Sequence, residues 1–471
     1  MKQADLVIKN AKIYTNGTFF QGAVAVRDGM IASVCTDSEI PEAEKVIDAE
    51  GKYLLPGMIE SHMHVREPGR PDRGTFFTET KAAAAGGVTT ILEHPIAKPP
   101  QYSKEILERR IRDASDKCVV DFAFFGAAGS KYPDKIREMG ETGIVAFKTF
   151  LHDAPEGRDE EFMGLTMAND GEMYFGFREV AKTGKLCAVH AENNDIISKM
   201  IKEFRKEGKV SPIYHCLSRP KFAEYETVGK LLMIAKDCGV KLIFCHMSTP
   251  ESMELIKSAK QEGLEVYMET CPQYLFLTEE DVVKHGAYAK CNPPLRKKED
   301  VDALWDYVRD GSVDFIGSDH ATYTVAEKES GKDDIFVAPS GFLGVDLRLP
   351  LMLNAVNEKR LSMERAVDLM STNVAKSFGL YPKKGVISAG ADADFVMVDM
   401  DEVFTVDKNQ NYSQSREIAK VYDGWSLKGK PVMTVVRGRV VMENGIVDEE
   451  SKGWGHLLET YIEKKVVSSD L

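Results

Sequence analysis

The chain has 471 residues, of which 43% are apolar and 29% are charged, a balance typical of a globular protein that folds in water. Its net charge of −13 argues against a nucleic-acid-binding or anionic-membrane-binding surface, because both need clustered lysine and arginine. The sequence has no run of about 18 uncharged apolar residues, which a transmembrane helix needs. Residues 1–10 lack the apolar core of a signal peptide, and the eight cysteines form no Cys-x-x-Cys pair. We therefore expect a cytoplasmic protein with reduced thiols.

Short alternating strands are predicted at both ends of the chain. Residues 1–54 contain "DLVIKNAKIYTNG" and "GAVAVRDGMIASV", in which "TNG" and "RDG" are hairpin signals. A similar pattern returns in residues 387–450, with "DADFVMVDM" and "PVMTVVRGRVVMENG". Because neither end shows long helical periodicity, we predict one small β-sandwich domain built from both termini. Residues 451–471 are expected to form a tail with a short helix.

Residues 55–386 show a different pattern, in which short apolar runs alternate with helix-like segments that often end in glycine. This alternation indicates a parallel sheet, and the eight runs match the strand number of a (β/α)8 barrel. A doubly wound open sheet is the competing fold, but no Gly-x-Gly-x-x-Gly follows the first run. We therefore predict an α/β protein whose main domain is a TIM barrel. The runs are 55–62, 88–94, 119–126, 143–150, 186–192, 241–247, 265–271 and 314–320.

Metal-ligand residue types occur at the ends of these runs. His62 and His64 end the first run, His190 and His246 lie at the ends of the fifth and sixth, and Asp319 lies at the end of the eighth. The strand ends of a barrel meet at one mouth, where such enzymes carry their chemistry. Side chains two residues apart on a strand point to the same side, so His62 and His64 can hold one metal ion. A lone His-x-His pair is often coincidental, but the additional strand-end residues favour a metal site.

Lys148, in the apolar run "VAFKTF", has two interpretations. A buried ammonium is costly unless it is paired, and an acid such as Glu192 is one possible partner. Carbamylation by CO₂ would instead turn the side chain into an anion with two oxygens that can bridge two cations. The residues alone favour the ion pair.

A set of longer motifs resembles a known family. In chain order they are "HMHVREPG", "KAAAAGGVTT", "AFKTF", "HAEN", "SRPKFAEYE", "CHMST", "ETCPQYLFLTEED", "CNPPLR" and "SDH". Together they resemble the cyclic amidohydrolases of the amidohydrolase superfamily, which include allantoinase, hydantoinase/dihydropyrimidinase and dihydroorotase. The likeness spans residues 1–445.

The resemblance implies a binuclear-metal hydrolase that opens a cyclic amide ring. It implies two divalent metal ions, usually zinc, with His62, His64 and Asp319 holding one and His190 and His246 holding the other. It also implies a homotetramer that acts on a small cyclic amide or ureide, with no nucleic-acid or membrane partner.

The resemblance also assigns the remaining roles. Lys148, carbamylated by CO₂, would bridge the two metals, which reverses the preference drawn from the residues alone. A hydroxide held by the metals would attack the ring amide, with Asp319 acting first as general base and then as general acid. Asn292 and Ser340 would hold the ring. Arg66 stands where dihydroorotases bind a substrate carboxylate.

The substrate shell departs from each subgroup. "EPGR" and "HAEN" are most similar to allantoinase, while "YHCLSRP" and "ETCPQYL" also resemble hydantoinase. Allantoinases usually have Pro-Leu-Asn where this chain has Pro95-Ile96-Ala97; hydantoinases place a tyrosine at Asp153, and the family usually has a proline at Thr322. We expect an allantoinase-like activity, with hydantoinase or dihydropyrimidinase activity as the alternative and dihydroorotase activity less favoured. A metal-free scaffold homologue and a mononuclear deaminase are the readings from other classes, and the filled ligand positions and Lys148 argue against them.

Overall fold

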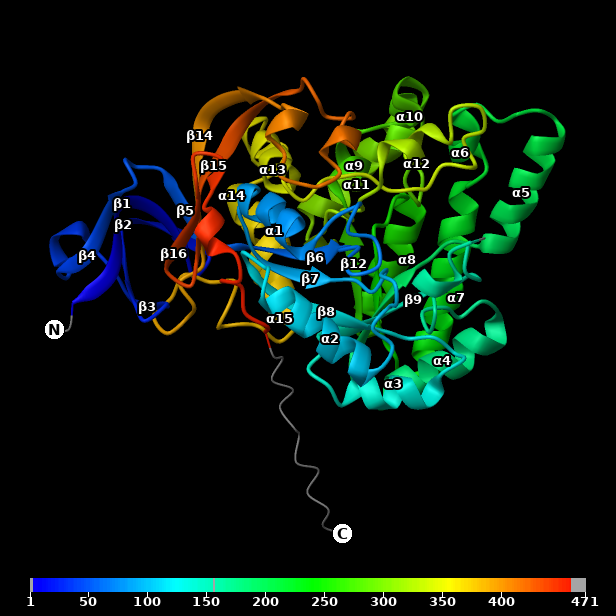
Figure 1. Ribbon diagram of the computed structural model, residues 1–471, viewed down its shortest axis with the longest axis horizontal. Coiled ribbons are helices and arrows are strands. Elements are labelled where there is room, and N and C mark those ends of the chain that lie inside the picture. Colours follow the sequence, from blue (N-terminus) through cyan, green and yellow to red (C-terminus); the bar gives the residue numbers. More distant parts are fainter. Residues whose placement is uncertain (1–2, 156, 459–471) are drawn as a thin grey trace, which may run out of the picture.

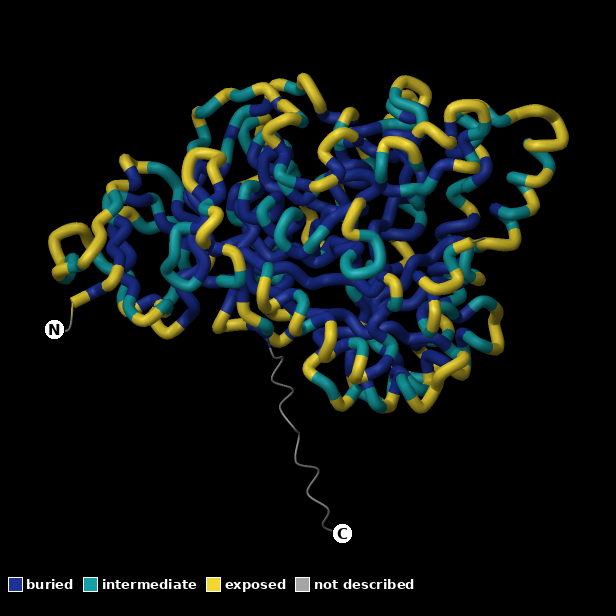
Figure 2. Tube along the Cα trace, in the orientation of Figure 1, coloured by how far each residue is buried: buried dark blue, intermediate teal, exposed yellow. Residues whose placement is uncertain are grey.

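The computed structural model describes residues 3–155 and 157–458. A barrel makes up the larger part of the molecule, and a second sheet lies beside it (Figure 1). Buried segments run through both sheets, whereas exposed residues gather on the outer helices and loops (Figure 2). None of the helices in the described ranges is long and apolar enough to cross a membrane. Residues 459–471, which carry most of the predicted tail, lie outside the described residues.

Eight parallel strands follow one another around the barrel in chain order. The last strand returns to the first, because Met63 and His320 form a parallel bridge and the backbone N–H of His64 donates to the carbonyl of His320 at 3.0 Å. The predicted (β/α)8 barrel is therefore confirmed, and the doubly wound sheet is excluded. The strands are β6 (Met58–Met63), β7 (Val88–Glu93), β8 (Asp121–Ala127), β9 (Ala146–Phe150), β10 (Leu186–His190), β11 (Lys241–Phe244), β12 (Val266–Thr270) and β13 (Phe315–Ile316).

Helices alternate with these strands and cover the barrel. They are α1 (Phe76–Ala85), α2 (Lys104–Ser115), α3 (Pro133–Gly140), α4 (Asp170–Lys182), α5 (Asn194–Lys206), α6 (Ile213–Leu217), α7 (Lys221–Cys238), α8 (Pro250–Gln261), α9 (Pro272–Phe276), α10 (Glu279–His285), α11 (Lys298–Arg309), α12 (Val325–Glu329), α13 (Arg348–Asn357), α14 (Met363–Val367) and α15 (Asn373–Ser377). The sequence marks several of their ends. Thr75 caps α1 by accepting from the N–H of Thr78, and Thr249 caps α8 ahead of Pro250. Gly239 ends α7 at a φ of 72°, which glycine adopts without steric cost.

Strands from both ends of the chain form one nine-stranded sheet. They are β1 (Ala4–Thr15), β2 (Thr18–Arg27), β3 (Met30–Cys35), β4 (Ala43–Asp48), β5 (Tyr53–Pro56), β14 (Phe395–Thr405), β15 (Ser426–Val436), β16 (Arg439–Glu443) and β17 (Ile446–Val447). The antiparallel pairing of β5 with β14 joins the N-terminal strands to the C-terminal ones. The predicted β domain from both termini is therefore confirmed, and Ile8, Ile13, Leu54, Phe395 and Val435 belong to its core.

A buried group of charges fastens the barrel to this β domain. Lys384 is 2% exposed, and its ammonium contacts the carboxylates of Asp121, Asp392 and Asp394. Arg437 adds a second cation, since its Nε donates to Oδ1 of Asp121 at 3.0 Å and its backbone N–H donates to Oδ1 of Asp394 at 2.8 Å. Asp121 begins β8, at the barrel end opposite the mouth, whereas Asp394 and Arg437 flank strands of the β domain. Lys384 and Arg437 together offset two of the three negative charges, so these side chains form a buried ion-pair cluster.

Replacing Lys384 with methionine is expected to destabilise the fold. The change would leave three buried carboxylates with one cation, and breaking a buried ion pair on one side costs about 3–5 kcal/mol of unfolding free energy. Urea denaturation followed by circular dichroism measures the loss. Lys383→Met, at the exposed neighbouring position, is the control. A loss no larger than that of the control would contradict the role given to the cluster.

Candidate metal centre

Three side chains of the predicted metal set converge at the mouth of the barrel. The Nε2 atoms of His62 and His64 lie 3.3 and 3.4 Å from Oδ1 of Asp319, which follows β13. Burial lowers the pKa of His64 to about 3, so its ring is neutral and has a lone pair to offer. Burial acts to raise the pKa of Asp319, but the surrounding imidazoles, led by His62, outweigh this and lower it. Two imidazoles beside a carboxylate are ligand types that zinc accepts.

His190 and His246 form a second pair beside the first. His190 ends β10 and His246 follows β11, and Nδ1 of His190 lies 3.2 Å from Nε2 of His246. The His246 ring stacks on the His62 ring with centroids 5.4 Å apart. Burial lowers the pKa of His246 well below its usual value, so this ring is also neutral. The structure thus brings the two predicted groups of ligands together.

Lys148 lies in β9 and is completely buried. Its amine donates to Sγ of Cys245 at 3.2 Å and lies 5.1 Å from the ring centre of Phe150. None of the ion pairs among the described residues includes Lys148. Glu192, which the sequence offers as its partner, contacts His190 and an arginine instead. Lys148 is thus a buried amine without a carboxylate, an unfavourable position for an unmodified cation.

Two predicted ligands have an uncommon backbone conformation. The φ angles of His246 and Asp319 are 43° and 50°, in the left-handed region. Such conformations cost roughly 1–3 kcal/mol each in non-glycine residues and gather at functional sites. Hydrogen bonds hold the His246 turn, since its backbone N–H donates to Oε1 of Glu269 at 3.3 Å. The strain indicates that these side chains are placed for a function.

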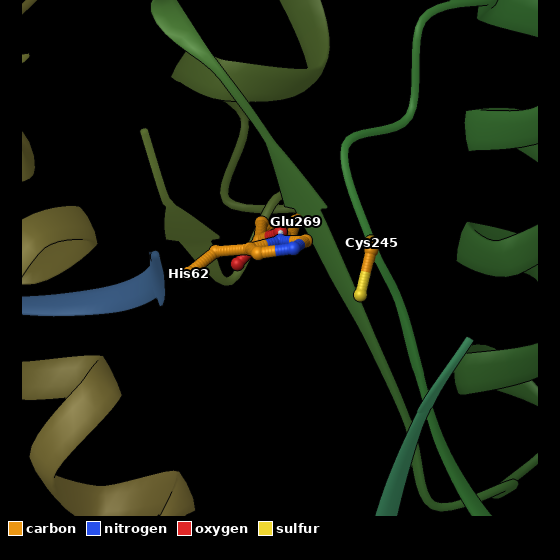
Figure 3. A group of neighbouring side chains, drawn as sticks. All are labelled: His62, Cys245 and Glu269. Carbon is orange, nitrogen blue, oxygen red and sulfur yellow. Dashed lines mark hydrogen bonds and ion pairs between the residues drawn. The ribbon is translucent and has the colours of Figure 1, made fainter. Parts of the chain in front are cut away.

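Glu269, in β12, supports the centre in a way that the sequence analysis missed. Its Oε1 accepts from Nδ1 of His62 at 2.7 Å, and its Oε2 accepts from the hydroxyl of Ser61 at 2.8 Å. Figure 3 shows His62 against Glu269, with Cys245 beside them on a neighbouring segment. Because Glu269 accepts a hydrogen bond from Nδ1–H of His62, the Nε2 of His62 is the nitrogen that faces Asp319. The one available signal was the position of Glu269 near the end of the seventh apolar run.

Glu192 supports the second pair in the same manner. Its Oε2 lies 2.9 Å from Nε2 of His190 and also contacts the guanidinium of Arg219. Burial acts to raise the pKa of Glu192, but Arg219 and His190 outweigh this and lower it to about 2. The carboxylate leaves Nδ1 of His190 directed at His246.

Two further histidines, His94 and His320, contact the residues of the centre. The His94 ring stacks on that of His62 with centroids 3.9 Å apart, and its Nε2 lies 3.0 Å from the carbonyl of Ser61. His320 contacts Oε2 of Glu79 through Nε2 at 2.8 Å. Both rings therefore position the strands that carry the predicted ligands.

The predicted substrate residues have different surroundings. Arg66 is buried, donates to the carbonyl of Ile96 at 2.9 Å and lies 5.4 Å from the ring centre of Tyr323. Oδ1 of Asn292 is buried and has no hydrogen-bond partner among the described residues. Ser340 is half-buried in an irregular segment. Arg66 thus has a structural contact of its own, while Asn292 retains an unused acceptor.

Comparison with known proteins agrees with this geometry. The sequence model of the amidohydrolase family matches residues 53–441. The chain belongs to the amidohydrolase family. L-hydantoinase from Paenarthrobacter aurescens is 36% identical to this amidohydrolase over 458 residues, covering 96% of this chain and 98% of the relative. Allantoinase from Rubrobacter xylanophilus is 35% identical over 450 residues, covering 95% and 96%.

Solved structures give the same result. The structure of L-hydantoinase (dihydropyrimidinase) from Arthrobacter aurescens superposes on this amidohydrolase with a TM-score of 0.92 at 35% identity, covering 97% of this chain and 100% of that one. The predicted membership among the cyclic amidohydrolases, and with it a hydrolase acting on cyclic amides, is confirmed. Within that group, the hydantoinase relatives support the alternative prediction better than the allantoinase-like one.

Exchanging Glu269 for glutamine is expected to weaken metal binding by this amidohydrolase about 10–100-fold, because the amide no longer offers His62 a charged acceptor. Competition with a zinc chelator of known affinity measures the change. Glu265→Gln is the matched control, since Glu265 lies just before the same strand and is exposed. Equal zinc affinities of the Glu269→Gln protein and the control would show that Glu269 does not support the ligands.

Proposed function

We propose that this amidohydrolase opens the ring of 5-substituted hydantoins or dihydropyrimidines by hydrolysing a ring amide bond. The observation that carries the proposal is the convergence of two histidines and Asp319 at the barrel mouth, in a chain that aligns over nearly its whole length with L-hydantoinase. The predicted cytoplasmic location and homotetramer stay predictions.

The donor set fits two divalent metal ions. His62, His64 and Asp319 offer ligand atoms that lie within 4.8 Å of one another. His190 and His246 would hold a second ion next to the first. Lys148, carbamylated by CO₂, would supply an anionic bridge, which agrees with its burial and with the absence of a carboxylate partner among the described residues. Imidazole and carboxylate donors suit zinc, and also manganese, cobalt or iron.

Residues of this chain would transfer the proton and bind the ring. When bound, two divalent cations would lower the pKa of a water molecule and polarise the carbonyl of the ring amide. Asp319 would accept the proton of the attacking water at a carboxylate oxygen and return it to the ring nitrogen as that nitrogen leaves. Its side chain is 14% exposed, against 1% for His62, so it is the more accessible group. Asn292 and Ser340 would bind the imide of the ring.

An apolar wall beside the metal centre favours particular substituents. Phe150, at the end of β9, packs together with Ile96, Phe162 and Leu165, which lie in the segments after β7 and β9. The Phe150 ring lies 5.8 Å from the His190 ring. Allantoin is a hydantoin with a ureido group at C5, and that group would leave N–H and carbonyl groups without partners against this wall. An alkyl or aryl group would gain from burial there. The wall supports a hydantoin with an apolar 5-substituent.

A side-by-side hydrolysis assay on zinc-reconstituted protein tests the proposal. The substrates are 5-benzylhydantoin, hydantoin, dihydrouracil, allantoin and dihydroorotate. We expect kcat/KM above about 10⁴ M⁻¹ s⁻¹ for 5-benzylhydantoin, a usual enzyme value, and at least about tenfold less for allantoin. A preference for allantoin would move the activity to the ureide branch. No turnover of any of these rings by the metal-loaded protein would contradict the proposal.

The substitution Lys148→Ala tests the bridge. Without the side chain, we expect the metal content to fall below about two ions per chain and kcat to fall at least about 10³-fold, since a mechanism with two metals needs both. Elemental analysis and the same assay measure the two effects. Lys182→Ala, on the exposed end of α4, is the control. Unchanged metal content and rate would eliminate Lys148 as a bridging residue.

A further inference from the structure

Two buried lysines outside the metal centre hold a single irregular segment. Lys290, 5% exposed, donates from Nζ to the carbonyl of Ile335 at 2.7 Å and to that of Ala338. Lys328 in α12, 1% exposed, donates to the carbonyl of Pro339 at 3.0 Å and to that of Gly341 at 2.5 Å. Backbone groups of an irregular buried segment need partners, and these two side chains satisfy four carbonyls of residues 335–341.

Neither amine has a carboxylate partner among the described residues. The charges that face Lys290 are Arg219, Lys328, Arg205 and Asp334, and Asp334 is already bound to Arg205 at 2.9 Å. Burial is the main reason that the pKa of Lys290 lies well below its usual value. The contacts of the Lys290 amine are therefore hydrogen bonds to the backbone of residues 335–341, and it forms no ion pair among the described residues.

Lys328 has a similar environment. Its neighbours are the Cys291 thiol, Glu327 and the ring of Tyr323, whose centre lies 5.1 Å away. Glu327 forms an ion pair with the guanidinium of Arg73. Burial lowers the pKa of Lys328 to about 7. Each lysine nitrogen has enough N–H bonds to donate to the two carbonyls that it contacts.

The held segment contacts the residues that precede Asn292 and those that follow Asp319. It contains Ser340, and the N–H of Gly341 donates to the carbonyl of Lys290 at 2.7 Å, two residues before Asn292. Gly341 has a φ of 121° and lies so close to Ala321, two residues after Asp319, that a Cβ at Gly341 would come within 2.7 Å of the Ala321 Cβ. The segment is therefore fixed against both neighbours at close range.

We propose that Lys290 and Lys328 form a clamp that positions residues 335–341 against the Asn292 segment, and that this clamp determines the affinity for the cyclic amide ring. The inference rests on the proposed function, because the ring is the ligand that Asn292 and Ser340 would share. Both lysines are positioning residues: they touch the backbone of the binding segment and none of the predicted metal ligands. Losing the clamp loosens the ring-binding backbone while His62, His64, His190, His246 and Asp319 keep their places.

The test compares Lys328→Met and Lys290→Met with the zinc-loaded wild-type protein. Methionine keeps the apolar stem and removes the N–H donors. Lys332→Met is the matched control, because Lys332 lies on the same connection and is exposed. KM and kcat are measured with 5-benzylhydantoin, and hydrogen–deuterium exchange is measured on peptides that cover residues 335–341.

Each clamp variant is expected to raise KM about tenfold or more while kcat changes less than about threefold, the pattern of lost binding to both ground state and transition state. Exchange in residues 335–341 should rise at least about tenfold, with metal content unchanged, because the carbonyl contacts no longer hold the segment. A fall in kcat at constant KM, or exchange equal to that of Lys332→Met, would overturn the proposal.

A variant that does not fold and a wild-type protein without activity have different consequences for the proposal. If a methionine variant does not fold, Lys328→Gln, which keeps a donor amide, takes its place, with the same expected rise in KM and exchange at smaller size. If the wild-type protein turns over no cyclic amide, the proposed function has failed. Exchange alone then decides the clamp, since a rise in the variants supports it and equal exchange overturns it.

Discussion

The closure of the barrel determines where everything else in the site lies. The backbone hydrogen bond from His64 to His320 joins the first strand to the segment after the last one. Because of this contact, Asp319 reaches His62 in β6 and His64 directly after it, although it lies far from both in the sequence. An open sheet would place its two edge strands at opposite sides, and the same residues would never meet. The arrangement of the candidate metal centre therefore depends on the topology first and on side-chain chemistry second.

Burial of the candidate metal centre means that its polar groups need hydrogen-bond partners within the protein. The four histidines among the predicted ligands are buried, and buried polar groups need close partners. Glu269 and Glu192 meet this need by directing one nitrogen of His62 and one of His190. The same requirement extends to the mouth, where lysine amines replace water as partners of loop carbonyls. Polar contacts of this kind fix geometry more than they add stability.

The sequence was informative wherever one local rule was enough. The spacing of His62 and His64 and the strand-end positions of His190 and His246 could be read directly, because a barrel maps strand ends to one mouth. The contact between His62 and Glu269 joins residues 207 positions apart and depends on strand register and rotamer, which no local pattern encodes. The pairing of Glu192 with Arg219 was missed for the same reason. The subgroup was harder still, because substrate preference depends on loops whose paths follow from packing.

The shared sheet of the two termini has a consequence for synthesis on the ribosome. β5 forms its antiparallel ladder with β14, which is translated only after the whole barrel. Until then the N-terminal strands present an unpaired edge, the kind of surface on which nascent chains associate wrongly. The barrel is synthesised after strands β1–β5 and before strands β14–β17. The β domain can therefore be completed only after the whole barrel has been synthesised.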